Sequence, residues 1–159
     1  MSDVTWPMGQ TGAEYRRAAE LLGGGKVLRA EVDGPLEAHA LIVRGIPGLA
    51  IRHLVGGLTT LGGGKDVARA MGLSLRTLQR IAASPAKSLS TEQSGRAWKF
   101  AEVLAKATEA LGSQEEAERW LERPAIGLDG RRPIDLLETP AGTEIVETLL
   151  GRIAYGVYA

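Results

Sequence analysis

Cysteine is absent from this chain of 159 residues, which excludes disulfide bonds, thiolate nucleophiles and zinc sites built on cysteine. Asparagine is absent too, so no N-linked glycosylation site exists. No run of about 18 apolar residues occurs, and residues 1–20 lack the basic start and apolar middle of a signal peptide. These absences favour a cytoplasmic protein with no membrane partner.

Residues suited to catalysis are scarce as well. The two histidines, His39 and His53, stand alone, with no HExxH or Ser–His–Asp signature around them. The carboxylates at positions 115–118 are interpreted as a solvated helix face. We therefore expect no enzyme activity, no catalytic residues, no cofactor and no metal site.

Two glycine-rich runs precede lysines, Lys26 and Lys65, and invite comparison with a phosphate-binding loop. Such a loop needs serine or threonine directly after the lysine, and this chain has Val27 and Asp66 there. The pattern therefore does not predict nucleotide binding.

What the chain does contain is the composition of an ordinary globular protein, with 44% hydrophobic and 24% charged residues and a formal net charge of zero. The charge is unevenly spread. Residues 60–106 carry 8 basic and 3 acidic side chains, whereas residues 107–159 carry 5 and 10. A basic segment beside an acidic one suits a polyanion and a basic partner respectively, although solvated charge without a function gives the same pattern.

Apolar residues recur at helical spacing along most of the chain, so the sequence predicts an all-α fold. Ser113, with Glu116 three residues later, has the pattern of a capping box that opens one helix, and Pro124 ends it. The segment 26–32 is too short to decide between strand and loop. Helices are predicted at residues 11–22, 36–43, 49–58, 64–83 (as two helices), 91–111, 113–123, 133–137 and 141–155.

Residues 64–83 have the spacing of a helix-turn-helix. Ala68 is small where the second helix crosses, Gly72 permits the left-handed turn, and Leu78 with Ile81 joins the two helices. Ser74 is placed to cap the second helix, which leaves polar side chains outward for bases and phosphates. A helical pair used only for packing is the alternative. The predicted DNA-binding residues are Lys65, Ser74, Arg76, Thr77, Gln79 and Arg80.

The stretch from about residue 60 to the end resembles the Xre/MbcA/ParS family of antitoxins. The similarity rests on VARAMGLSLRTLQR and on the later run RRPIDLLET followed by LLGRIAYGVYA. The resemblance implies an Xre-like helix-turn-helix domain followed by a small helical toxin-binding domain. It also implies a RES-type toxin partner, similar to ADP-ribosyl transferases and acting on NAD, whose NAD pocket the antitoxin covers while it represses its own operon.

The resemblance places the toxin-binding role in the C-terminal region. The residues to which it assigns this role are Arg131, Arg132, Asp135, Arg152, Tyr155, Gly156 and Tyr158. Each has an intramolecular alternative: Asp135 can cap its helix or pair with Arg131 or Arg132, and the tyrosines can pack within the domain. Trp120 is interpreted as a core residue.

We expect three parts: residues 1–58, a helical region of unassigned role that could serve dimerisation; residues 59–106, the DNA-binding region; and residues 107–159, the toxin-binding domain. A helix-turn-helix usually binds operator DNA as a symmetric pair, so a homodimer is expected. The alternative function is a stand-alone helix-turn-helix transcription regulator, whose C-terminal domain would sense a ligand.

Overall fold

The computed structural model describes residues 12–62 and 64–156, and all regular secondary structure within them is helical. The α-helices of this part are α1 (Gly12–Leu21), α2 (Gly24–Leu28), α3 (Pro35–Arg44), α4 (Gly48–Gly56), α5 (Lys65–Ala70), α6 (Leu75–Ala82), α7 (Thr91–Leu111), α8 (Gln114–Glu122), α9 (Pro133–Leu136) and α10 (Pro140–Ala154), and a 3-10 helix, η1, spans Ile126–Leu128. The all-α prediction is confirmed. None of these helices is long and apolar enough to cross a membrane.

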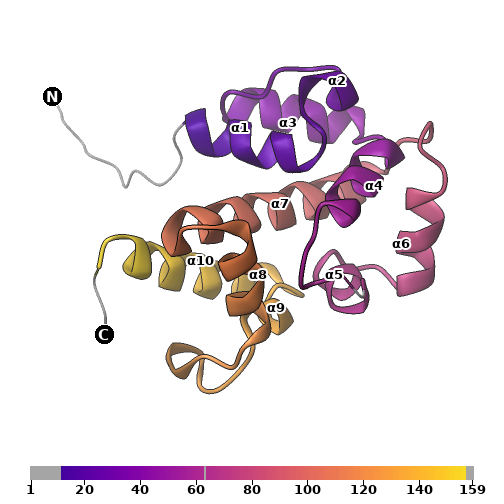
Figure 1. Ribbon diagram of the computed structural model, residues 1–159. Helices are drawn as coiled ribbons and strands as arrows, with labels where there is room; N and C mark the ends of the chain where they lie inside the picture. Colours follow the sequence, from indigo (N-terminus) through magenta and orange to yellow (C-terminus); the bar gives the residue numbers. More distant parts are fainter. Residues whose placement is uncertain (1–11, 63, 157–159) are drawn as a thin grey trace, which may run out of the picture.

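Helix α7 forms the centre of the molecule. It packs against α1, α3, α8 and α10, with α1 and α3 on one side of it and α8 and α10 on the other (Figure 1). Ser90 and Gln93 form a capping box at its start, and Gly112 ends it in the left-handed conformation. Alanines alternate with Trp98, Phe100 and other large apolar residues on its buried surface, so neighbouring helices can approach on several sides.

The segment that the sequence left open between strand and loop begins as a helix. Residues 24–28 form α2, which ends at Arg29 in the left-handed conformation, and no regular structure follows before α3. Leu28 and Val32 are nevertheless buried, because both contribute to the core that α1 and α4 complete. A helix of one turn shows too little of its period for the sequence pattern to reveal it.

The C-terminal helices wrap around one end of α7. The backbone N–H of Ala125 donates to the carbonyl oxygen of Arg131 at 3.1 Å, which closes a loop around η1. Helix α9 contacts both α5 and α10 and so lies between the first helix of the helix-turn-helix and the last helix of the chain. Val146 and Leu150 of α10 are buried, and Lys106 on α7 bonds Glu147 on α10 at 2.7 Å.

Candidate functional site

Helices α5 and α6 are held together by the residues that the spacing predicted. Ala68 and Leu78 are buried between them, and Ile81 is partly buried against the same core. Gly72 has φ 73°, the left-handed conformation that the tight turn requires and that other residues adopt at a cost. The N–H of Leu73 then donates to the Ala68 carbonyl at 2.8 Å and closes the turn.

The second helix presents a polar outer face. Ser74 caps α6 by accepting from the Thr77 N–H at 3.1 Å, and its hydroxyl also bonds the Thr77 hydroxyl. Arg76, Gln79 and Arg80 are exposed beyond the cap. Lys65 is exposed at the start of α5, whereas Thr77 is partly buried. The outward placement of these side chains is compatible with the DNA-binding prediction, which stays a prediction.

Helix α4 fixes the position of α6 from behind. A Cβ atom at Gly48 would lie 2.7 Å from the Ile81 carbonyl oxygen, so only glycine allows this approach. The Gly48 N–H donates to the Lys87 carbonyl at 2.7 Å, and Arg52 Nε donates to the Ala82 carbonyl at 2.9 Å. Helix α4 therefore holds α6 rigidly, and a surface that recognises DNA bases requires such support.

A buried carboxylate joins α8 to the loop before α5. Glu118 is 0% exposed. Its Oε1 accepts from the backbone N–H groups of Thr59, Thr60 and Leu61 at 2.8, 2.8 and 2.9 Å. Its Oε2 accepts from Gln114 Nε2 at 2.7 Å. The carboxylate thus satisfies backbone donors of the segment that leads into the helix-turn-helix.

The interpretation of residues 115–118 as a solvated face is wrong for Glu118. Glu115 and Glu116 are exposed and pair with Arg119, but Glu118 lies beside the buried Ala117 and Leu121 on the inner face of α8. The signal that could have revealed it is its place three residues before Leu121, at helical spacing. Trp120 is partly buried and packs against the core, which agrees with its interpretation.

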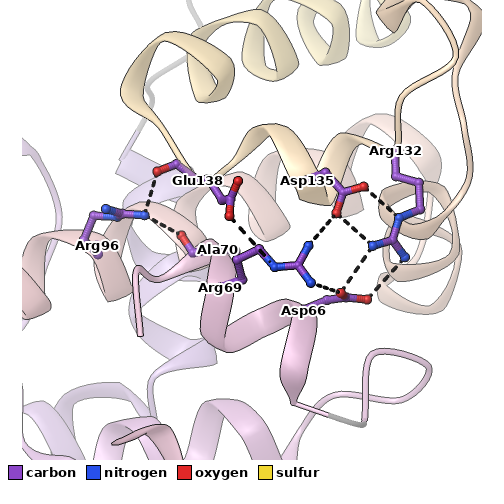
Figure 2. Close-up of polar contacts among 7 residues, drawn as sticks. All are labelled: Asp66, Arg69, Ala70, Arg96, Arg132, Asp135 and Glu138. Carbon is purple, nitrogen blue, oxygen red and sulfur yellow. Dashed lines mark hydrogen bonds and ion pairs between the residues drawn. The ribbon is translucent and has the colours of Figure 1, made fainter. Parts of the chain in front are cut away.

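A network of ion pairs joins α5 to α9 at a second place (Figure 2). Arg132, the residue before α9, bonds Asp135 on α9 at 2.8 Å and Asp66 on α5 at 3.2 Å. Arg69 on α5 bonds Asp135 at 3.2 Å and lies 3.9 Å from Glu138. We call these five residues the α5–α9 network.

The network sets the ionisation of its members. The hydrogen bond from Arg132, assisted by the charges of Arg132 and Arg69, holds the pKa of Asp135 below its ordinary value although burial opposes this. Hydrogen bonds to Asp135 and Asp66 raise the pKa of Arg132. Beside the network, Arg96 on α7 donates to the carbonyl oxygens of Ala70 at 3.1 Å and Glu138 at 3.0 Å and so joins the ends of α5 and α9 (Figure 2).

The predicted toxin-binding residues separate into two groups. Arg132 and Asp135 point toward α5 within the network (Figure 2). Either residue can contact a partner protein only if that contact replaces its ion pairs in the network. Arg131, Arg152, Tyr155 and Gly156 are exposed, three of them at the end of α10. Tyr158 lies outside the described residues.

Two exposed apolar residues that the sequence analysis did not select lie in the same domain. Ile126 in η1 is 98% exposed and Ile145 on α10 is 51% exposed. Ile145, Leu149 and Arg152 share one face of α10 by their spacing, and a Cβ atom at Gly127 would lie 3.3 Å from Leu149. We call Ile126, Ile145, Leu149, Arg152 and Tyr155 the α10 face. The sequence signal for this face was a second set of apolar residues on α10, Ile145 and Leu149, beside the set that faces α7.

Fold and site together define a helix-turn-helix protein with a helical C-terminal domain. Residues 37–102 match the family described as the antitoxin Xre-like helix-turn-helix domain. Residues 106–156 match the antitoxin Xre/MbcA/ParS C-terminal toxin-binding domain. Neither description is that of a catalytic domain.

Named proteins give the same result. Antitoxin Xre of Pseudomonas putida is 34% identical over 127 residues, which cover 79% of this chain and 76% of that protein. Antitoxin Xre of Photorhabdus laumondii is 29% identical over 126 residues, covering 79% and 82%. A Sphingobium protein named Prs ADP-ribosylating antitoxin is 27% identical over 134 residues, covering 79% and 82%. The chain belongs to the Xre/MbcA/ParS family and is an antitoxin of a toxin–antitoxin system with a helix-turn-helix domain.

Proposed function

We propose that this antitoxin neutralises a RES-type toxin by placing its α10 face over the toxin's NAD pocket, and that α6 binds the operator of its own operon. Membership of the family implies a toxin partner for the C-terminal domain and DNA for the helix-turn-helix. The RES type is supported by the resemblance carried by residues 131–159. The name of the Sphingobium relative, which refers to ADP-ribosylation, is compatible with it.

The observation that carries the proposal is the exposed α10 face within the segment that matches a toxin-binding domain. The side chains of Ile126 and Ile145 expose apolar surface to water, and this exposure does not stabilise a monomer. Tyr155 and Arg152 are residue types that contribute strongly at the centres of interfaces. The mechanism is occlusion: the antitoxin fills a cavity and performs no chemistry.

The test uses one variant for each face. Ile145→Lys places a charge in the proposed interface, and we expect it to weaken toxin binding by about 2 kcal/mol or more. Arg80→Ala removes a base-reading side chain, and we expect it to weaken operator binding by about 1–3 kcal/mol. Toxin binding is measured by co-purification and by survival of cells that express the toxin, and operator binding by titration of the upstream DNA.

Each variant is the control for the other. Ile145→Lys leaves operator binding unchanged, and Arg80→Ala leaves neutralisation unchanged, because the two side chains lie on different domains. Survival of cells that carry Ile145→Lys with the toxin would remove the α10 face from the mechanism. Operator binding with no neutralisation of any neighbouring gene product would instead support the stand-alone regulator.

A further inference from the structure

Helix α3 has an apolar face that no described part of the chain covers. Its inner face buries Ala38 and Leu41 against the core that α7 forms. On its outer face, Leu36 is 77% exposed, Val43 is 56% exposed, and Ala40 between them is exposed as well. These three residues are four and three positions apart, so they form one stripe along the helix.

The charges beside this stripe are arranged with opposite signs at opposite ends. Glu37 lies at the start of α3 and Arg44 at its end, both exposed. They are seven positions apart and therefore flank the stripe on the same side. Arg44 is held in place there, because its guanidinium donates to the carbonyl oxygens of Leu28 and Arg29.

The α3 surface is complementary to the same surface of a second copy when the two helices run antiparallel. In an antiparallel pair about a two-fold axis through Ala40, Leu36 of one copy meets Val43 of the other. The same side of the stripe meets its equivalent, so Glu37 lies beside Arg44 of the second copy, twice by symmetry. A parallel pair about a two-fold axis would instead carry Glu37 and Arg44 of the second copy to the opposite side of the interface, so neither pair would form. A two-fold interface requires such a self-complementary patch, and the small Ala40 at the crossing lets the helices approach closely.

We propose that this antitoxin forms a homodimer through α3, which packs against α3 of a second copy in antiparallel orientation. The inference deepens the proposed function, since a symmetric operator needs two helix-turn-helix units in a fixed relation. Only the biological purpose of the dimer rests on the proposed DNA binding. The interface itself can be tested without DNA or toxin.

The first experiment exchanges charges in the full chain and measures the dimer dissociation constant by sedimentation. Glu37→Arg and Arg44→Glu each turn two attractive pairs into two repulsive ones, and we expect each to weaken dimerisation about tenfold. A mixture of the two variants restores both pairs in the heterodimer, so it dimerises like the unchanged protein. Arg44→Glu also removes the contacts to Leu28 and Arg29, and its thermal unfolding is measured alongside. The restored heterodimer shows that any local damage is not the cause of the weakening.

The second experiment uses the absence of cysteine. Ala40→Cys introduces the one thiol of the chain next to the proposed axis, and it forms a covalent dimer under mild oxidation. Ile145→Cys, also exposed but on α10, is the matched control and crosslinks far more slowly. Ala40→Arg, which blocks the close approach, leaves the chain monomeric.

The inference is overturned if Ala40→Arg stays dimeric or if the charge-exchanged mixture fails to recover. The inference is also overturned if the unchanged protein, with its α3 stripe intact, is monomeric. A dimer that forms only after residues 1–11 are deleted would mean that these residues cover the stripe, and it overturns the inference as well. Failure of the proposed function has a different signature: the α3 dimer forms and binds no operator. An unchanged operator affinity in a dimeric Ala40→Arg protein would preserve the function and reject the interface.

Discussion

Two of the contacts that join the helix-turn-helix to the C-terminal domain in the described part of the chain are built in opposite ways. Glu118 is fully buried and accepts hydrogen bonds from three consecutive backbone N–H groups. The α5–α9 network pairs Asp66 and Arg69 with Arg132 and Asp135, and these side chains stay between 27% and 42% exposed. A buried carboxylate cannot be removed without leaving donors unpaired, whereas solvent can replace partners in an accessible network. The first contact therefore fixes the fold, and the second remains open to competition from a partner.

The largest effect is expected at the buried contact. Glu118→Ala leaves the N–H groups of residues 59–61 without their acceptor, and we expect a loss of about 3 kcal/mol or more in the free energy of unfolding. Glu118→Gln keeps one acceptor oxygen and costs less. Glu115→Ala on the exposed side of α8 is the control and changes the free energy of unfolding by about 0.5 kcal/mol or less. Urea denaturation measures all three, and equal effects of Glu115→Ala and Glu118→Ala would show that burial does not distinguish these carboxylates.

A smaller effect is expected in the network. A double-mutant cycle of Asp66→Ala and Arg132→Ala should give a coupling energy of about 0.5–1 kcal/mol at low salt. Because these side chains are accessible to solvent, the coupling should shrink in 1 M salt, where the Debye length is about 3 Å. The effect of Glu118→Ala should hardly depend on salt. A coupling that survives high salt would mean that the network acts as a buried contact.

The smallest effect concerns pH. The pKa of Asp135 is lowered in the folded protein, so its ionised form contributes stability at pH values above its unfolded pKa of about 3.9. This contribution is lost as the pH falls through the folded pKa. Asp135→Asn should therefore be less stable than the unchanged protein at neutral pH, and the difference should close below about pH 4. Thermal unfolding from pH 7 to pH 3 measures it, and a difference that grows toward acid would have the wrong sign for this account.

The parts of the fold that depend on neighbours in sequence were predictable. Ala68, Gly72 and Leu78 act within one helix pair, so their spacing alone predicts the turn and the packing that the structure has. The cap by Ser113 is equally local, and its side chain accepts from the Glu116 N–H at 3.1 Å. The Glu116 side chain pairs with Arg119, so only this half of the predicted capping box is formed. The wider helical pattern was predictable for the same reason, apart from the single turn of α2.

The contacts between domains were not predictable in the same way. Glu118 bonds Thr59, and Arg132 bonds Asp66, across separations of 59 and 66 residues. No periodicity connects such positions, and a glutamate among other glutamates looks solvated. The division at residues 58/59 and 106/107 stays a prediction, as do the individual DNA-binding and toxin-binding residues.

The central claim is that the end of the chain binds the toxin while α5 and α6 bind DNA independently. The most direct measurement deletes residues 151–159 and compares toxin neutralisation with operator binding in the same protein. The account predicts that cells expressing the toxin die with the shortened antitoxin, while its affinity for the operator is unchanged. Survival of those cells would contradict it.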